Sequence, residues 1–435
     1  MSNITPAAAA TISPEDARGL QANIWKFYLF RFFVDFQLWL PIWAVYLIDE
    51  RGLSLTQLTA LDAPFWILLI VLEVPTGAIA DRWGRKISLS YGALTNAIAV
   101  VVFGIATNFG VLLISYMVWA AAFTLYSGAD SAFVYDSLRA TGRERDYTKL
   151  WGRARAIQAV GAVLGLLLGA PLAHFTTLWV PVVASGGLMA VAWIVSFSFR
   201  EPPRFENPDE QPSYFNVVKE AFGVAFRKPS VRYMMLLTAG VMGVGVSMII
   251  LQQPFLSDHE MPIWSFGIFL TPGQLLSMVA ALVTYRVLTL IGVSRIIILM
   301  PLVVMTTAVG LGAIDYVAAF AFYPLTTTMF AMSFVVISDY LNRRIPSANR
   351  ATILSIHNMI FSLAVAGMEP LLGWLGDTWG LPVAYRMAAI IVAVLAAPLL
   401  ALWLRAHRQE QLPGEEVLGS GDSEAEAEPE PAQPP

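Results

Sequence analysis

The 435-residue sequence contains no cysteine. This absence excludes disulfide bonds, thiol catalysis and metal sites built on cysteine. Histidine is also scarce, and its four copies lie far apart, without the paired spacing of a helical zinc site: His174, His259, His357 and His407. The sequence has no glycine-rich phosphate loop that ends in Gly-Lys-Ser/Thr. We therefore expect no enzyme activity, no cofactor and no bound metal.

Charged residues are few. They make up 13% of the chain, whereas soluble domains carry about 25%. Hydrophobic residues make up 57%, and the mean hydropathy is +0.63. The net charge of −4 comes largely from acids between Glu415 and Glu430. This composition predicts an all-α integral membrane protein with many spans, and we expect no nucleic-acid partner.

Twelve apolar stretches are long enough to cross a bilayer, which takes about 20 residues in a helix. The number predicts twelve transmembrane helices. The stretches are Trp25–Ile48, Leu58–Ala80, Ile87–Ala106, Phe109–Tyr135, Ala154–Leu172, Val180–Phe199, Tyr233–Phe255, Trp264–Thr289, Ile296–Ile314, Val317–Tyr340, Ala351–Leu375 and Val383–Leu404.

A polar segment, residues 200–232, divides these helices into two groups of six. We expect an N-terminal tail over 1–24, a six-helix bundle over 25–199, a linker over 200–232, a second bundle over 233–404 and a disordered acidic tail over 405–435. Within the linker, apolar residues at helical spacing predict an amphipathic surface helix: Phe215, Val218, Phe222, Ala225 and Phe226.

Lysine and arginine are unevenly distributed between the loops. They crowd the loops between helices 2 and 3, 4 and 5, and 10 and 11, and they flank the linker, whereas the opposite side carries only Arg51 and Arg386. Because basic loops stay on the cytoplasmic side, we expect both termini and the linker in the cytoplasm, and the protein in the plasma (inner) membrane.

The turn after the second helix carries the motif Gly77-Ala-Ile-Ala-Asp81-Arg82-Trp-Gly84-Arg85-Lys86. This motif resembles the G-x-x-x-D-R-x-G-R-[RK] signature of the major facilitator superfamily, and with the twelve helices the resemblance covers the whole ordered chain. It implies a major facilitator fold of two pseudo-symmetric six-helix bundles. In appearance the chain is closest to bacterial efflux-type members that export drugs or metabolites.

The resemblance also implies that this motif is a conformational latch, in which an arginine pairs with an acid at the end of helix 4. Asp136 occupies that position. We expect Gly77 to allow a neighbouring helix to approach closely and Gly84 to allow a tight turn. Alternatively, the basic loop only sets the topology.

Helix 5 carries Gly161, Gly165 and Gly169 at four-residue spacing. The spacing loosely resembles a glycine-rich motif of antiporters in this superfamily, and it equally fits ordinary close packing of helices. Drug:proton antiporters also carry an arginine in the first half of helix 4, but this chain has none there.

Ionisable residues at membrane depth mark transport pathways by default. Arg31 and Asp35 lie four residues apart in helix 1, on one face, and Asp130 lies at similar depth in helix 4. One arginine facing several carboxylates leaves an acid without a fixed partner, and we expect Asp35 to carry a coupling proton. A pair that only neutralises charge is the alternative.

The remaining candidates for the proton and substrate pathway are more scattered. The ionisable ones are Glu73, His357 and Glu369; the uncharged ones are Tyr126, Gln252 and Gln253, with Gln158, Gln274, Tyr323 and Asn358 beside them. Trp39, Trp43, Phe65 and Trp66 are expected to face lipid or the membrane interface rather than to stack on a ligand. The resulting cavity is apolar and aromatic, which suits a lipophilic or amphipathic solute.

These observations predict a monomeric secondary active transporter that works by alternating access. We expect proton-coupled export of lipophilic drugs or metabolites. The alternatives are proton-coupled uptake of a small nutrient and a non-transporting receptor of the same fold.

Overall fold

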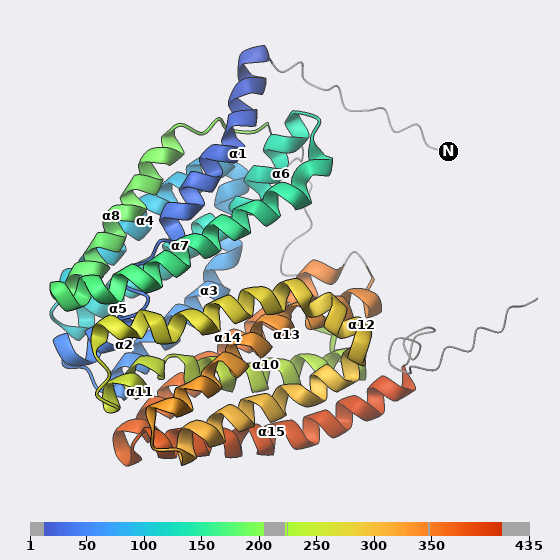
Figure 1. The fold of residues 1–435 in the computed structure, drawn as a ribbon. Helices are drawn as coiled ribbons and strands as arrows, with labels where there is room; N and C mark the ends of the chain where they lie inside the picture. Colours follow the sequence, from blue (N-terminus) through green and yellow to red (C-terminus); the bar gives the residue numbers. More distant parts are fainter. Residues whose placement is uncertain (1–12, 204–221, 224, 347–348, 411–435) are drawn as a thin grey trace, which may run out of the picture.

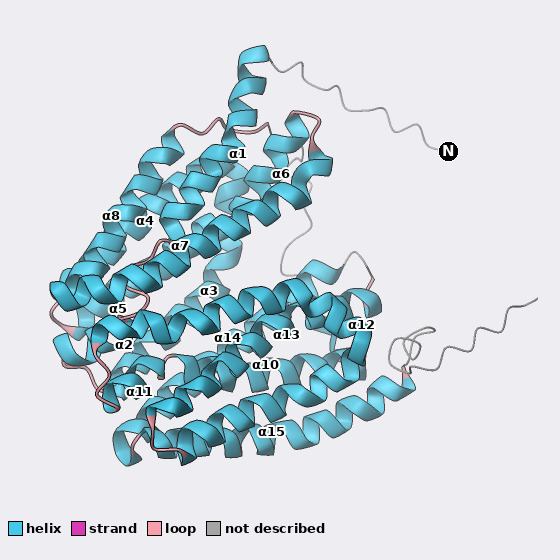
Figure 2. Cartoon of the chain, viewed as in Figure 1, coloured by secondary structure: helices cyan, strands magenta, loops and turns pink. Residues whose placement is uncertain are grey.

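The structure, a computed structural model, describes residues 13–203, 222–223, 225–346 and 349–410. Helices make up nearly all of this part of the chain (Figure 2), and it contains no strand. Ten of its helical segments are long and apolar enough to cross a membrane. The predicted all-α membrane fold is thereby confirmed, whereas most of the predicted linker helix lies outside the described residues.

Two groups of helices pack side by side (Figure 1). The N-terminal half contains α1 (Pro14–Asp35), α2 (Trp43–Val45), α3 (Leu55–Trp83), α4 (Arg85–Ile105), α5 (Phe109–Ser127), α6 (Asp130–Ala140), α7 (Tyr147–Phe175) and α8 (Trp179–Phe197). The C-terminal half contains α10 (Pro229–Ile249), α11 (Gln252–Asp258), α12 (Phe266–Ala313), α13 (Tyr323–Arg344), α14 (Arg350–Trp379) and α15 (Leu381–Gln409).

The ten spans are consistent with twelve crossings. Two predicted helices, the eighth and ninth, run together as α12, but Gly292 inside it has φ 76°, so the chain turns there. The first predicted helix is absent from the ten: its helical part, α1, carries six charged residues and ends at Asp35, and the chain later passes through a π-helical turn over Tyr46–Glu50.

Three predicted helices are each divided into two shorter helices. The first breaks after Asp35, the fourth between Ser127 and Asp130, and the seventh between Ile249 and Gln252. The first break has a clear packing partner in α7. A Cβ atom on Gly165 would lie 2.5 Å from the Gln37 carbonyl oxygen, and one on Gly169 would overlap that of Leu38. The glycines of α7 therefore make room for the irregular backbone of residues 36–42.

Each bundle has two ends, which are defined here by where the chain begins and finishes. We call the end at which α1 begins and α15 finishes the terminal end, and the opposite end the distal end. One continuous apolar core fills the C-terminal half and extends into the distal part of the N-terminal half. A separate core, around Phe27, Phe30 and Phe133, fills the terminal part of the N-terminal half. The two halves therefore share a core only toward the distal end.

Hydrogen bonds join the two halves at the same end. The Asp377 carboxylate of α14 accepts the backbone N–H groups of Leu55 (3.0 Å) and Thr56 (2.8 Å), which are exposed donors at the start of α3. Gln253 of α11 donates to the Leu40 carbonyl (2.9 Å) and accepts from the Ala44 N–H (2.7 Å). These contacts close the distal end.

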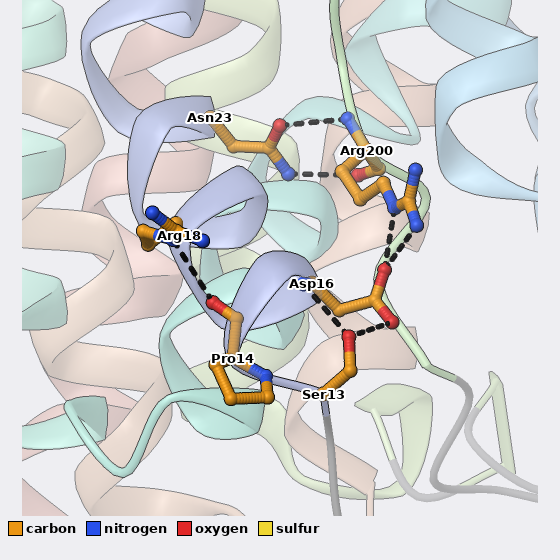
Figure 3. A network of polar contacts seen from close by, with 6 residues as sticks. All are labelled: Ser13, Pro14, Asp16, Arg18, Asn23 and Arg200. Atoms are coloured by element: carbon orange, nitrogen blue, oxygen red, sulfur yellow. Dashed lines mark hydrogen bonds and ion pairs between the residues drawn. The ribbon is translucent and has the colours of Figure 1, made fainter.

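At the terminal end, α1 is tied to the chain that follows α8 (Figure 3). The buried Asn23 amide donates to the Arg200 carbonyl (2.8 Å) and accepts from the Arg200 N–H (2.9 Å). The Arg200 guanidinium also binds Asp16. A hydrogen bond from Ser13 and the nearby Arg200 lower the pKa of Asp16, so this tie is kept at neutral pH.

Candidate functional site

A buried ionic cluster lies between α1 and α6. Arg31 Nη2 is 2.8 Å from Asp35 Oδ2, and Arg31 Nη1 is 3.5 Å from Asp130 Oδ2. The guanidinium also lies over the Tyr126 ring, 5.7 Å from its centre. The structure thus brings together four of the predicted pathway residues. One arginine reaches both carboxylates.

Asp130 lies at the N-terminus of a helix, whereas Asp35 lies at the C-terminus of another. Asp130 is the first residue of α6, where the helix dipole favours a negative charge, and its Oδ1 accepts the Ser131 N–H (2.7 Å). Asp35 is the last residue of α1, where the dipole opposes a negative charge. The charge of Asp35 therefore depends on the side chains around it.

Two of those side chains come from α7. Gln158 Nε2 donates to Asp35 Oδ1 (3.1 Å), and Arg155 Nη1 donates to Gln158 Oε1 (3.0 Å). Arg155 was not predicted as a pathway residue, although its position inside the fifth apolar stretch was the available signal. The chain of contacts from Arg155 to Asp130 contains two cations and two anions.

The motif after α3 forms a compact charged turn. Arg85 Nη1 is 2.5 Å from Asp81 Oδ1, and Arg85 Nε is 3.6 Å from Asp136 Oδ2 at the end of the fourth crossing. Gly84 has φ 117°, as expected for a tight turn. The expectation for Gly77 is wrong in this conformation, because no described atom lies within 4 Å of a Cβ placed there. Arg82 is exposed.

The start of the linker is bound to the same turn. Glu201 accepts the backbone N–H groups of Arg85 (2.7 Å) and Lys86 (2.8 Å), which open α4. The Lys86 ammonium donates to the Phe197 carbonyl (2.9 Å). A Cβ on Gly84 would lie 2.7 Å from a Glu201 oxygen. Glycine is therefore required at residue 84 by both its φ angle and this contact.

Two of the cavities that described residues line lie between the halves. The first, of about 310 Å³, is lined by α3, α5 and α14 and contains Glu73 and Asn358. The second, of about 460 Å³, contains Gln252, Gln253 and Gln274 beside the rings of Trp39 and Trp43. The second cavity has no ionisable side chain in its described lining.

Of the aromatic residues predicted to face lipid, Trp43 is buried, and Trp39, Phe65 and Trp66 are partly buried and pack against the core. Trp43 is 7% exposed and packs on Phe103 with ring centres 4.8 Å apart. Trp66 crosses between the halves to the Phe361 ring, 5.8 Å away. For Trp39 and Trp43, which line the second cavity, the prediction was wrong, because an interfacial belt of aromatic residues and an aromatic cavity lining have the same sequence pattern.

Three other predicted residues lie away from these cavities. His357 is buried in α14 with its Nε2 3.0 Å from the Thr238 hydroxyl of α10. Tyr323 is fully buried in the C-terminal half, where it hydrogen-bonds Tyr385. Glu369 is also buried, but it contacts Asp62 of α3, which was not predicted. The signal for Asp62 was its place inside the second apolar stretch.

The architecture matches that of a known protein family. A family model described as Major Facilitator Superfamily matches residues 27–368, more than three quarters of the chain. The chain belongs to the major facilitator superfamily. It is thus a multi-pass membrane protein of a transporter family rather than an enzyme, and small-molecule substrates are the general rule for this family. The family predicted from the motif is confirmed.

Individual relatives are distant. The Bacillus subtilis (strain 168) protein named uncharacterized MFS-type transporter YxaM is 22% identical over 369 residues, which cover 81% of this chain and 89% of that protein. The quinolone resistance protein NorA of Staphylococcus aureus is 24% identical over 184 residues, 42% of this chain and 46% of NorA.

Solved structures confirm the fold. A point mutant of the nucleoside transporter NupG superposes with a TM-score of 0.77 at 14% identity, covering 88% of this chain and all of NupG. A bacterial homologue of the human lysosomal transporter Spinster, in an inward-facing and unoccupied conformation, gives 0.68 at 18% identity, covering 94% of this chain and all of that one.

Proposed function

We propose that this protein is a proton-coupled secondary transporter that exports lipophilic or amphipathic compounds by alternating access. The observation that carries the proposal is the buried Arg31, which is shared by Asp35 and Asp130 between two broken helices. Interrupted helices and ionisable groups at membrane depth are typical of coupling sites in secondary transporters.

In this proposal Asp35 binds the coupling proton. Its position at the end of α1 opposes the carboxylate charge, and Arg31 and Gln158 offset that cost. When Asp35 takes up a proton, Arg31 keeps a full ion pair with Asp130, whose charge the start of α6 favours. The arginine is therefore never left buried without a counter-ion, which keeps both protonation states accessible.

The substrate occupies the cavity lined by Trp39, Trp43 and the three glutamines. Apolar rings bury a hydrophobic body, and the amides of Gln252 and Gln274 offer hydrogen bonds to a polar group. A solute with a high charge finds no counter-ion in the described lining of this cavity. The lack of a charged side chain in the described lining supports an uncharged or weakly charged substrate.

The closed distal end and the cavities together represent one access state. The cavity that contains Glu73 and Asn358 is lined by the middle of α3 and by the terminal parts of α5 and α14. If the terminal end is cytoplasmic, as the basic loops predict, this state is inward-facing. We further propose a monomer in the plasma membrane, with the Asp81–Arg85–Asp136 cluster acting as a latch between access states.

Export is favoured over uptake by the likeness to NorA, whose name refers to quinolone resistance. Uptake of a small nutrient is the second candidate, because α5 lacks the arginine of drug:proton antiporters. A receptor that does not transport is disfavoured by the ionic cluster, since a static protein gains nothing from buried charges.

The test is a substrate screen with the purified protein in proteoliposomes under an imposed pH gradient. The proposal predicts that lipophilic compounds move in the direction opposite to the protons and that a protonophore abolishes their accumulation. Co-directional movement of a polar nutrient would identify the uptake alternative. Movement that ignores the gradient would contradict proton coupling.

A further inference from the structure

A second pair of acids lies between the two halves, apart from the cluster around Arg31. Asp62 lies on α3 and Glu369 on α14; they are 8% and 2% exposed. The Glu369 carboxyl lies against the Asp62 carboxyl, within hydrogen-bond contact. Within the described part of the chain, neither carboxyl forms an ion pair with a lysine or an arginine.

The donors around Asp62 indicate how this pair is protonated. The Tyr116 hydroxyl of α5 donates to Asp62 Oδ1, and Trp66 Nε1 donates to Asp62 Oδ2 (3.0 Å). An ionised carboxylate only accepts hydrogen bonds, so a hydrogen bond between two carboxyl groups requires one proton. Because Asp62 already accepts on both oxygens, the geometry places the proton on Glu369. One Glu369 oxygen, Oε2, is buried and has no hydrogen-bond partner among the described atoms.

The pair lies just inside the closed distal end. One turn nearer to that end, a Cβ on Gly373 of α14 would overlap the Thr59 hydroxyl of α3, so the two helices touch. The bonds from Asp377 to the start of α3 follow beyond it. Separation of α3 from α14 at the distal end would therefore break the contact between Asp62 and Glu369.

Other titratable groups on the neighbouring helices are engaged elsewhere. Tyr116 of α5 faces the pair, as described. Tyr385 of α15 and Tyr323 of α13 bind each other, and His357 of α14 binds Thr238 of α10. The pair thus has no described cation to balance a second negative charge. Two buried carboxylates in contact repel each other strongly unless one is protonated.

We propose that Asp62 and Glu369 form a second proton-binding site, which holds the distal ends of the two halves together while it is protonated and releases them when it loses its proton. This inference rests on the alternating-access function proposed above. The proton held here is distinct from the one assigned to Asp35, since Asp35 is held by Arg31 and Gln158 whereas Asp62 is held by Tyr116 and Trp66. It acts as a switch on the distal gate, and acid conditions keep the gate closed.

The experiment measures the distal gate directly. Cysteines replace Thr177 and Tyr316, two exposed residues in distal loops of opposite halves. Because the chain has no other cysteine, spin labels attach only there. The distance distribution between the labels is recorded by electron paramagnetic resonance on full-length protein in lipid nanodiscs, between about pH 5 and about pH 9.

We expect the longer, open distance to gain population as pH rises, by up to about tenfold per pH unit for a single linked proton. Glu369→Gln keeps a donor toward Asp62 without a titrating proton, so it should hold the gate closed at every pH. Asp62→Asn removes one charge and should also lose the pH response, and it serves as the test if Glu369→Gln does not fold. Asp146→Asn is the matched control, because it removes an exposed acid at the terminal end that pairs with Arg143, so the response of the distal gate should be retained.

A wild-type distance distribution that does not change with pH would overturn the inference, and so would a Glu369→Gln variant that responds as the wild type does. Both readouts are independent of transport. A failure to find a transported substrate would contradict the proposed function, yet it would leave this result standing.

Discussion

Arg31 Nη2 lies 2.8 Å from Asp35 Oδ2, one helical turn away, at the point where the first crossing loses its helical form. The irregular backbone that follows is packed against the glycines of α7. Gln158 of the same helix holds the other oxygen of Asp35. The acid proposed to carry the proton is therefore positioned by the helix break itself, and movement of α7 relative to α1 changes its surroundings.

The packing of α7 on the broken helix can be tested by stability. Gly169→Ala should lower the apparent melting temperature of the purified protein, because the new Cβ would overlap the Leu38 carbonyl oxygen. Overpacking of this kind costs about 1–3 kcal/mol. Thermal unfolding in detergent, followed by tryptophan fluorescence, measures the effect.

The control lies in the same helix. No described atom is within 4 Å of a Cβ placed on Gly152, and alanine in a helix interior is favoured over glycine by about 0.5–1 kcal/mol. Gly152→Ala should therefore leave the melting temperature unchanged or raise it slightly. Equal destabilisation by both substitutions would show that the packing of Gly169 is not special.

If the Asp81–Arg85–Asp136 cluster acts as a latch, a variant that weakens it should transport more slowly but still fold. Asp81→Asn removes the charge that faces Arg85 at 2.5 Å, so the balance between the access states should shift and transport should slow by about tenfold or more. The rate is measured in proteoliposomes once a substrate is known. Asp146→Asn, which removes the partner of Arg143 in an exposed pair, should have little effect. Unchanged rates and unchanged accessibility for Asp81→Asn would mean that the motif only sets topology.

Topology is testable because the chain contains no cysteine. A membrane-impermeant thiol reagent applied to intact cells should label a cysteine at Asp315, in a distal loop, and should not label one within residues 205–210 of the linker. Labelling of the linker from outside would reverse the proposed orientation.

The sequence predicted the fold class and the family, and both are confirmed, because span length and the motif after helix 2 depend on local sequence. The pairing of Asp136 with an arginine of that motif was also anticipated. The helix breaks were not. A break after Asp35 depends on contacts with glycines more than a hundred residues away, which hydropathy along one helix does not report.

The contact between Asp62 and Glu369 was missed for a similar reason. The two acids lie in different apolar stretches, and only the packing of α3 on α14 brings them together. Trp39 and Trp43 were assigned to lipid because a single helix does not indicate which of its faces meets another helix. Their place in the cavity lining follows from the arrangement of both halves.

Transport against a gradient by the Asp35→Asn variant tests most directly whether Asp35 carries the coupling proton. Wild-type and variant protein are reconstituted in parallel into proteoliposomes, and accumulation under a pH gradient is compared with substrate binding and with downhill exchange. We predict that Asp35→Asn loses gradient-driven accumulation while binding and exchange stay largely intact, since the amide cannot carry a proton. If the variant still accumulates substrate against its gradient, Asp35 does not carry the coupling proton.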